Sequence, residues 1–222
     1  MTAPAPAPSV YAPIVRHYER CLRAHGPTAK GVDWPDETDL AVRFDVLLDG
    51  WPAGRENGAE RRLLDVGCGP GLLLDHLAAT GRAGLYRYTG LDVSAAMIGA
   101  ARNRWPGHRF EHRDILADPL PPGAFDWGVV NGVLTVRRDV PQETMAAFAR
   151  HLIAAAYAAC RVGLAVNVMS PHVDWTRPDL FHWPIDEAVG FATDKLTRHV
   201  AVRADYGLYE YALFLYRQPN RG

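Results

Sequence analysis

The segment Leu-Leu-Asp-Val-Gly-Cys-Gly-Pro-Gly at residues 63–71 constrains the fold of this 222-residue chain more than any other. An apolar run that ends in closely spaced glycines, followed by a helical pattern from Leu72 to Ala79, predicts a strand, a tight turn and a helix. Backbone amides and the positive end of a helix then face a ligand. Glycine is needed where no side chain can stand between the backbone and that ligand. The segment therefore predicts an α/β unit with a ligand site at a strand end.

The spacing of these glycines distinguishes between cofactor classes. A dinucleotide-binding turn has its third glycine three positions after the second, and that position is Leu72 in this chain. The glycines lie instead at 67, 69 and 71. A nicotinamide-dependent reductase is thereby disfavoured, although it stays an alternative.

Further segments follow the glycine turn in a defined order. They are Tyr-Thr-Gly-Leu-Asp-Val-Ser at 88–94, Met97, Arg-Asp-Ile at 113–115 and Phe-Asp-Trp-Gly-Val-Val-Asn at 125–131. Together with the turn they resemble the class I S-adenosylmethionine-dependent methyltransferases over roughly positions 60 to 216. The resemblance implies S-adenosyl-L-methionine as cofactor. It also implies an α/β fold with a seven-stranded, mostly parallel sheet, helices on both faces and an antiparallel last strand.

The same resemblance implies residues for the adenosyl half of the cofactor. Asp92 would accept hydrogen bonds from both ribose hydroxyls, as suits a carboxylate. Val93 and Met97 would border the adenine, and Asp114, followed by Ile115, would meet its amino group. Taken singly, each of these residues is also compatible with turn chemistry, ordinary core packing or, for Asp92, a helix cap.

For the methionine half, the glycine turn would pass close under the ligand, and Asp65 or Asn131 would receive the ammonium group. Arg43 is a candidate for the carboxylate, because a guanidinium can hold it with two parallel bonds. The expected cofactor-binding residues are Asp65, Gly67, Cys68, Gly69, Gly71, Asp92, Val93, Met97, Asp114, Ile115, Asn131 and Arg43.

Strand and helix patterns alternate along the chain, which predicts a parallel sheet covered on both faces. The expected strands lie near 62–66, 86–91, 108–112, 125–131 and 162–168, and the expected helices near 71–80, 94–104 and 141–160. Two final strand-like runs, 196–204 and 209–216, are joined by only four residues. Since such a link is too short for a crossover helix, these two runs form an antiparallel pair.

The N-terminal part has a character of its own. We expect a disordered Ala/Pro tail at 1–9, a helical lid at 10–58 with helices at about 10–24 and around residues 43–48, and a cofactor-binding core at 59–222. Ligands of such sheets bind outside the carboxyl ends of the strands, where a lid could cover them. The expected substrate-binding residues are Tyr18, Trp34 and Tyr206, each of which is also compatible with packing alone.

His172 and Asp174 follow the fifth expected strand and are candidates for catalysis. A histidine that titrates near neutrality could take a proton from an oxygen or nitrogen nucleophile, and the carboxylate could orient it. The alternative is a polar loop that caps the next turn. The spacing of His172, Asp174 and His182 matches no recognised metal site, and we expect no metal.

Composition narrows the classes of partner. A formal net charge of −1 offers no positive field for nucleic acid, and residues 131–134 depart from the motif of nucleobase amino methyltransferases. The apolar runs are too short to span a bilayer, and Cys21, Cys68 and Cys160 suggest no disulfide framework. We therefore expect a cytoplasmic enzyme with a small-molecule substrate, without a membrane or nucleic-acid partner and of undetermined oligomeric state.

These observations favour a methyltransferase that acts on an oxygen or nitrogen of a small metabolite. The alternatives are an enzyme that uses the same cofactor for cyclisation or aminocarboxypropyl transfer, and a noncatalytic adenosyl-binding regulator.

Overall fold

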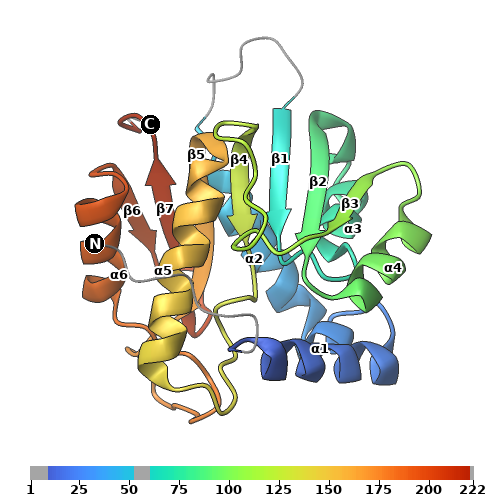
Figure 1. Cartoon of the computed structure of the whole chain (residues 1–222), viewed down its shortest axis with the longest axis horizontal. Coiled ribbons are helices and arrows are strands. Elements are labelled where there is room, and N and C mark those ends of the chain that lie inside the picture. Colours follow the sequence, from blue (N-terminus) through green and yellow to red (C-terminus); the bar gives the residue numbers. More distant parts are fainter. Residues whose placement is uncertain (1–9, 53–60, 221–222) are drawn as a thin grey trace.

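A computed structural model describes residues 10–52 and 61–220, and within them a seven-stranded sheet has the order β3-β2-β1-β4-β5-β7-β6 (Figure 1). The strands are β1 (Arg61–Val66), β2 (Tyr86–Asp92), β3 (Arg109–His112), β4 (Phe125–Val130), β5 (Cys160–Met169), β6 (Val200–Arg203) and β7 (Glu210–Tyr216). The first five strands pair in parallel, and β7 runs antiparallel to both β5 and β6. The predicted fold class, including its antiparallel last strand, is confirmed.

Strand β6 is shorter than the run predicted at 196–204. The helix α6 (Ile185–Lys195) precedes it, and the backbone N–H groups of Leu196 and Thr197 both donate to the carbonyl of Ala192. These residues therefore close the helix and cannot join the sheet. Helix α6 itself was not predicted, because its buried side chains, Ala188 and Ala192, are too small to give a clear apolar stripe.

The helices form a layer on each face of the sheet. Helices α5 (Gln142–Ala158) and α6 share one apolar cluster with β4 and β5, and α5 lies in front of the sheet in Figure 1. Helices α2 (Glu37–Asp49), α3 (Leu72–Ala79) and α4 (Ala95–Arg104) share the other cluster. Short 3-10 turns lie at η1 (Lys30–Val32) and η2 (Ala83–Leu85).

Helix α2 belongs to the core. The indole of the fully buried Trp127 donates to the carbonyl of Leu47 over 3.2 Å, and its ring stacks on Trp51 with centroids 6.0 Å apart. Burial of large aromatic side chains contributes strongly to the stability of such a layer. Of the N-terminal segment, α2 is thus anchored in the core, and α1 and η1 lie over the strand ends together with the side chains of Leu40 and Phe44 from α2.

Helix α1 (Ala12–His25) crosses the carboxyl ends of the parallel strands, which point toward it in Figure 1. Ile14 and Tyr18 lie one turn apart on its inner side, and the helix ends at Gly26, whose φ of 67° suits glycine. The predicted tail at 1–9 and the lid boundary near residue 58 lie outside the described residues. None of the helices in the described ranges combines the length and apolar character that a bilayer crossing requires.

Candidate functional site

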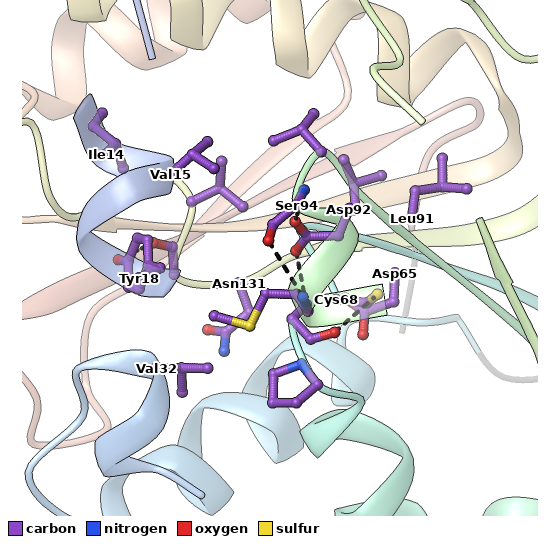
Figure 2. Close-up of a pocket in the computed structure, with 18 of the residues that line it drawn as sticks. Ile14, Val15, Tyr18, Val32, Asp65, Cys68, Leu91, Asp92, Ser94 and Asn131 are labelled. Carbon is purple, nitrogen blue, oxygen red and sulfur yellow. Dashed lines mark hydrogen bonds between the residues drawn. The ribbon is translucent and has the colours of Figure 1, made fainter. Parts of the chain in front are cut away.

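A cavity lies between α1 and the carboxyl ends of β1, β2 and β4. Figure 2 shows Asp65 and Asp92 on the sheet side and Ile14, Val15 and Tyr18 of α1 on the opposite side. The predicted site residues that line this cavity are Tyr18, Trp34, Asp65, Gly67, Cys68, Gly69, Asp92, Val93, Met97, Asp114, Ile115 and Asn131. Residues up to 113 positions apart in the sequence thus meet at one edge of the sheet.

The glycine turn has the backbone that its sequence predicts. Gly67, Gly69 and Gly71 have φ values of 76°, 53° and 86°, in the left-handed region that favours glycine. A Cβ on Gly67 would lie 2.2 Å from a methyl group of Val133, so a side chain there would displace the opposite wall. Gly71 does not line the cavity; it is the N-cap of α3, and a Cβ there would face Phe110.

Asp92 is held at the end of β2 by backbone donors. Its Oδ2 accepts from the N–H of Gly69 over 2.9 Å, and its Oδ1 accepts from the N–H of Ser94 over 2.8 Å. Burial raises the pKa of Asp92, and these two donors oppose that rise. Ser94, whose hydroxyl accepts from the N–H of Met97, caps α4. Asp92 is therefore not the cap, and because each of its oxygens accepts one of these bonds, each can still accept a further hydrogen bond.

A second acidic group lies beneath the turn. The buried Asp65 accepts from the hydroxyl of Tyr88 over 2.7 Å. Burial raises the pKa of Asp65 to about 7, and the charge of Asp92 adds to this rise. Close by, the buried Oδ1 of Asn131 has no hydrogen-bond partner among the described residues and lines the same cavity. An acceptor left in this state fits a ligand that brings a donor such as an ammonium group.

Side-chain hydrogen bonds fasten α1 to the rim. Tyr11 donates to Asp114, Tyr18 donates to the carbonyl of Gly132 over 3.1 Å, and Ser94 donates to Glu19 over 2.7 Å. Neither Tyr11, which lines the cavity, nor Glu19, which holds Ser94, was predicted from the sequence. The seven-residue spacing of Tyr11 and Tyr18, which places them on one side of a helix, is the signal that could have indicated the first.

Arg43 lies away from the cavity lining. Its guanidinium stacks on Trp34, with Cζ 3.7 Å from the ring centroid, and pairs with the buried Glu210. Trp34 does line the cavity, where its ring lies against Gly132. Arg43 is thus placed to position Trp34. Tyr206 is half-buried, packs against the apolar cluster that contains α2, and also lies outside the cavity lining.

His172 and Asp174 are exposed and are not brought to the cavity. After β5 the chain continues alongside β7, because the N–H of Ser170 donates to the carbonyl of Tyr209 over 3.1 Å. Neither His172 nor Asp174 lines the cavity, although Arg177 of the same loop lies near enough to Asp33 for their charges to interact. Among the described residues, the cavity lining includes no histidine.

The cavity thus combines two acceptor carboxylates at the strand ends, an acidic group beneath a glycine turn and walls that are mostly apolar. Carboxylates suit paired hydroxyl and amino donors, and the unpartnered Asn131 suits a cation nearby. Such an arrangement can hold a nucleoside with a charged aliphatic extension. The residues fit S-adenosylmethionine.

Comparison with known proteins agrees with this chemistry. Residues 63–154 match the model of a methyltransferase domain. A Mycobacterium tuberculosis protein named "putative methyltransferase" is 30% identical over 153 residues, which cover 68% of this chain and 90% of that protein. Trans-aconitate 2-methyltransferase of Rhodopseudomonas palustris is 42% identical over 73 residues, which cover 33% of this chain and only 27% of that enzyme.

Solved structures share the fold at low identity. Human N-acetylserotonin methyltransferase in complex with S-adenosylmethionine aligns with a TM-score of 0.62 and 15% identity, over 96% of this chain and 60% of that one. Magnesium protoporphyrin IX methyltransferase of Synechocystis with bound S-adenosylhomocysteine aligns with a TM-score of 0.58 and 16% identity, over 95% and 97% of the two chains. The chain belongs to the class I S-adenosylmethionine-dependent methyltransferases and takes S-adenosylmethionine as its cofactor.

Proposed function

We propose that this methyltransferase transfers a methyl group to an oxygen or nitrogen of a small, uncharged and largely apolar metabolite. The observation that carries the proposal is the contrast between the two parts of the cavity. Acidic side chains gather at the glycine turn and near the ends of β2 and β3, whereas apolar and aromatic side chains, among them those of α1, η1, α2 and α5, line much of the rest.

The cofactor occupies the acidic part in this proposal. Asp92 accepts the ribose hydroxyls, Val93 and Met97 border the adenine, and Asp114 takes its amino group. Asp65 and Asn131 receive the methionine ammonium group, with Gly67 and Gly69 leaving room for the chain. The support is the geometry of the described side chains, above all the two backbone donors that fix Asp92.

The acceptor occupies the wall near Tyr18, Trp34 and Phe44 in this proposal. A polyanionic acceptor such as aconitate would need a free cation, but Arg113 of the cavity lining and Arg43, which lies over Trp34, are both engaged. Arg43 is paired with Glu210, and Arg113 contacts Glu111 over 3.0 Å and Asp118 over 3.3 Å. Because the site has acidic residues and no uncommitted arginine among the described lining residues, it favours a neutral acceptor.

The side chains of this enzyme mainly position the acceptor and exclude water. S-adenosylmethionine, when bound, supplies a methyl group already activated by its sulfonium, so alignment of the acceptor lone pair is the main requirement. The segment formed by α1 and η1 acts as the lid that excludes water. A general base is needed only for an acceptor that arrives protonated. His172 would reach the site only if its loop moved.

The first test is calorimetric titration with S-adenosylmethionine, S-adenosylhomocysteine and NADH. We expect the two sulfur compounds to bind in the submillimolar range and NADH not to bind. A metabolite screen for S-adenosylhomocysteine release would follow, with neutral phenols and amines in one arm and di- and tricarboxylates in the other. Turnover confined to the carboxylates would refute the proposed acceptor class, and methylthioadenosine as product would refute methyl transfer.

The variant Trp34→Ala tests the part of the cavity in which the acceptor is proposed to bind. We expect it to raise the acceptor KM at least about tenfold while the affinity for S-adenosylmethionine stays within about threefold, since a buried aromatic contact contributes on the order of 1.5–3 kcal/mol. The exposed Trp175, which lies outside the cavity lining, provides the control as Trp175→Ala.

A further inference from the structure

Three side chains of different chemistry converge on the outer side of the lid. His17 and Cys21 lie four positions apart on one face of α1, and Asp33 directly follows η1. The Nε2 of His17 lies 2.7 Å from Oδ2 of Asp33 and 3.8 Å from Sγ of Cys21. One donor atom from each of these residues lies within 4.8 Å of the other two. We propose that His17, Cys21 and Asp33 form a binding site for a divalent cation of the zinc class.

The distances are close to those of a tetrahedral centre. With bonds of about 2.0–2.3 Å to nitrogen, oxygen and sulfur, neighbouring ligand atoms around zinc lie roughly 3.2–3.7 Å apart. The separations of 2.7 Å and 3.8 Å from Nε2 of His17 bracket this interval. Side-chain shifts on the order of 1 Å would therefore place all three donors at bonding distance from one ion.

The geometry differs from that of a catalytic triad. In a nucleophile–histidine–acid triad the two ring nitrogens of the histidine serve different partners. Here a single nitrogen, Nε2 of His17, faces both the carboxylate and the sulfur. A single N–H cannot point well at both the carboxylate and the sulfur. A cation placed between the nitrogen, the carboxylate oxygen and the sulfur could bind all three atoms.

The donor set also selects the ion. A thiolate and a carboxylate carry two negative charges, which a neutral imidazole leaves unchanged, so a divalent ion gives a neutral centre. Mixed nitrogen, sulfur and oxygen donors suit zinc, whereas magnesium and calcium require oxygen donors alone. Asp33 has a side chain 42% exposed, which leaves room for water as a fourth ligand.

Positive side chains near the site are partly neutralised. The positive charge of Arg138 interacts electrostatically with Cys21, and that of Arg177 interacts electrostatically with Asp33. Both arginines pair with Asp179, over 3.7 Å and 2.6 Å. Their repulsion of a bound cation is therefore reduced, although Arg20 adds a further positive charge beside Cys21.

A cation at this place would join the two parts of the lid. His17 precedes Tyr18, and Asp33 stands between Val32 and Trp34, and these three neighbours line the cavity. Figure 2 shows Tyr18 on α1 and Val32 on η1 on the same side of that cavity. The ion would thus fix the lid wall without contact with the cofactor. This inference does not depend on the proposed acceptor.

The test uses the full chain without an affinity tag, treated with chelator and kept reduced. Co²⁺ is titrated as a spectroscopic probe, and Zn²⁺ binding is then measured by calorimetry. We expect one equivalent to bind, with a thiolate-to-cobalt charge-transfer band and a rise in Tm on addition of Zn²⁺. Cys21→Ser, His17→Gln and Asp33→Asn should each weaken Zn²⁺ binding at least about tenfold, and Cys21→Ser should remove the charge-transfer band.

The matched controls are His25→Gln, at the exposed end of the same helix, and Cys160→Ala, in the buried core. Both should keep the wild-type affinity for Zn²⁺. The proposal is overturned if the wild-type chain binds less than one equivalent, or if Cys21→Ser and His17→Gln bind Zn²⁺ as tightly as the wild type. Folding of each variant is verified by circular dichroism, and the conservative Asp33→Asn keeps the test valid if a helix variant is unstable.

Discussion

Arg43 lies over Trp34, with its guanidinium carbon 3.7 Å from the centroid of the indole ring. The same guanidinium pairs with Glu210 at the start of β7. Glu210 also accepts from Asn167 over 2.6 Å, and Asn167 accepts from the N–H of Gly132 over 2.8 Å. A wall residue of the cavity is thus connected through a buried polar network to the ends of β5 and β7.

Replacing only one residue of the buried pair Arg43 and Glu210 should lower the free energy of unfolding much more than replacing both. We expect Glu210→Leu to lower the free energy of unfolding by about 3–5 kcal/mol, because Arg43 would keep a buried and unpaired charge. The double variant Arg43→Met with Glu210→Leu should recover much of this loss. Urea unfolding measures both. The exposed pair of Arg203 and Asp205 is the control, since Asp205→Ala should leave the free energy of unfolding nearly unchanged. A double variant as unstable as the single one would contradict this account.

The parts of the site that the sequence predicted are local. The glycine turn, the acid at the end of β2 and the strand–helix order depend on residues close together in the chain, whose spacing is set by backbone geometry. Parallel pairing also explains why Asp92 and Gly69 lie close together. Because β1 and β2 are parallel neighbours, the residues that follow their carboxyl ends meet at one edge of the sheet.

The parts that the sequence did not predict depend on long-range packing. Arg43 was expected at the cofactor carboxylate, but its partner Glu210 lies 167 positions away and no periodic pattern reports that pairing. His172 was expected near the site from its position after β5, yet it lies outside the cavity lining, and the path of its loop depends on backbone hydrogen bonds to distant segments, from Ser170 to Tyr209 and from Phe181 to Thr135. Such contacts follow from the tertiary structure alone.

Asp92→Ala should weaken S-adenosylmethionine binding at least about tenfold. The substitution removes a charge-assisted contact, which is worth roughly 1.5–3 kcal/mol. Isothermal titration calorimetry measures the affinity, and Asp194→Ala on α6 is the control. Asp92 also holds the N–H groups of Gly69 and Ser94, so circular dichroism must show that the variant is folded. An unchanged affinity in a folded variant would rule out the assignment of the ribose site to Asp92.

Tyr11→Phe should loosen the lid. It removes the hydrogen bond from the Tyr11 hydroxyl to the carboxylate of Asp114, which is one of the contacts that fasten α1. A hydrogen bond to a charged group contributes about 1.5–3 kcal/mol, so hydrogen exchange of the α1 amides should become at least about tenfold faster. Tyr209→Phe, at an exposed tyrosine, should leave this exchange unchanged. Equal protection in Tyr11→Phe and wild type would show that the contact does not hold the helix.

The stability of the protein should depend on Asp65. Its pKa is raised to about 7 by burial, above the value near 4 of an unfolded chain. The folded state therefore retains a proton that the unfolded chain releases, and the free energy of unfolding should decrease as the pH rises from about 4 to about 7. Asp65→Asn keeps an acceptor for Tyr88 and should remove this contribution. Denaturant unfolding at several pH values measures the difference between the two proteins, which should grow across this window and remain constant above it.

Binding of S-adenosylmethionine should release a proton from Asp65. If the ammonium group of the cofactor lies near this carboxylate, its positive charge favours the ionised form and lowers the pKa from about 7. The affinity should then rise with pH across the range below about 7 and level off above it, because less proton release is required at higher pH. Calorimetry near pH 6.5 in two buffers with different ionisation enthalpies counts the released protons. Asp65→Asn should show less release than the wild type, and a buffer-independent enthalpy in the wild type would place the ammonium group away from Asp65.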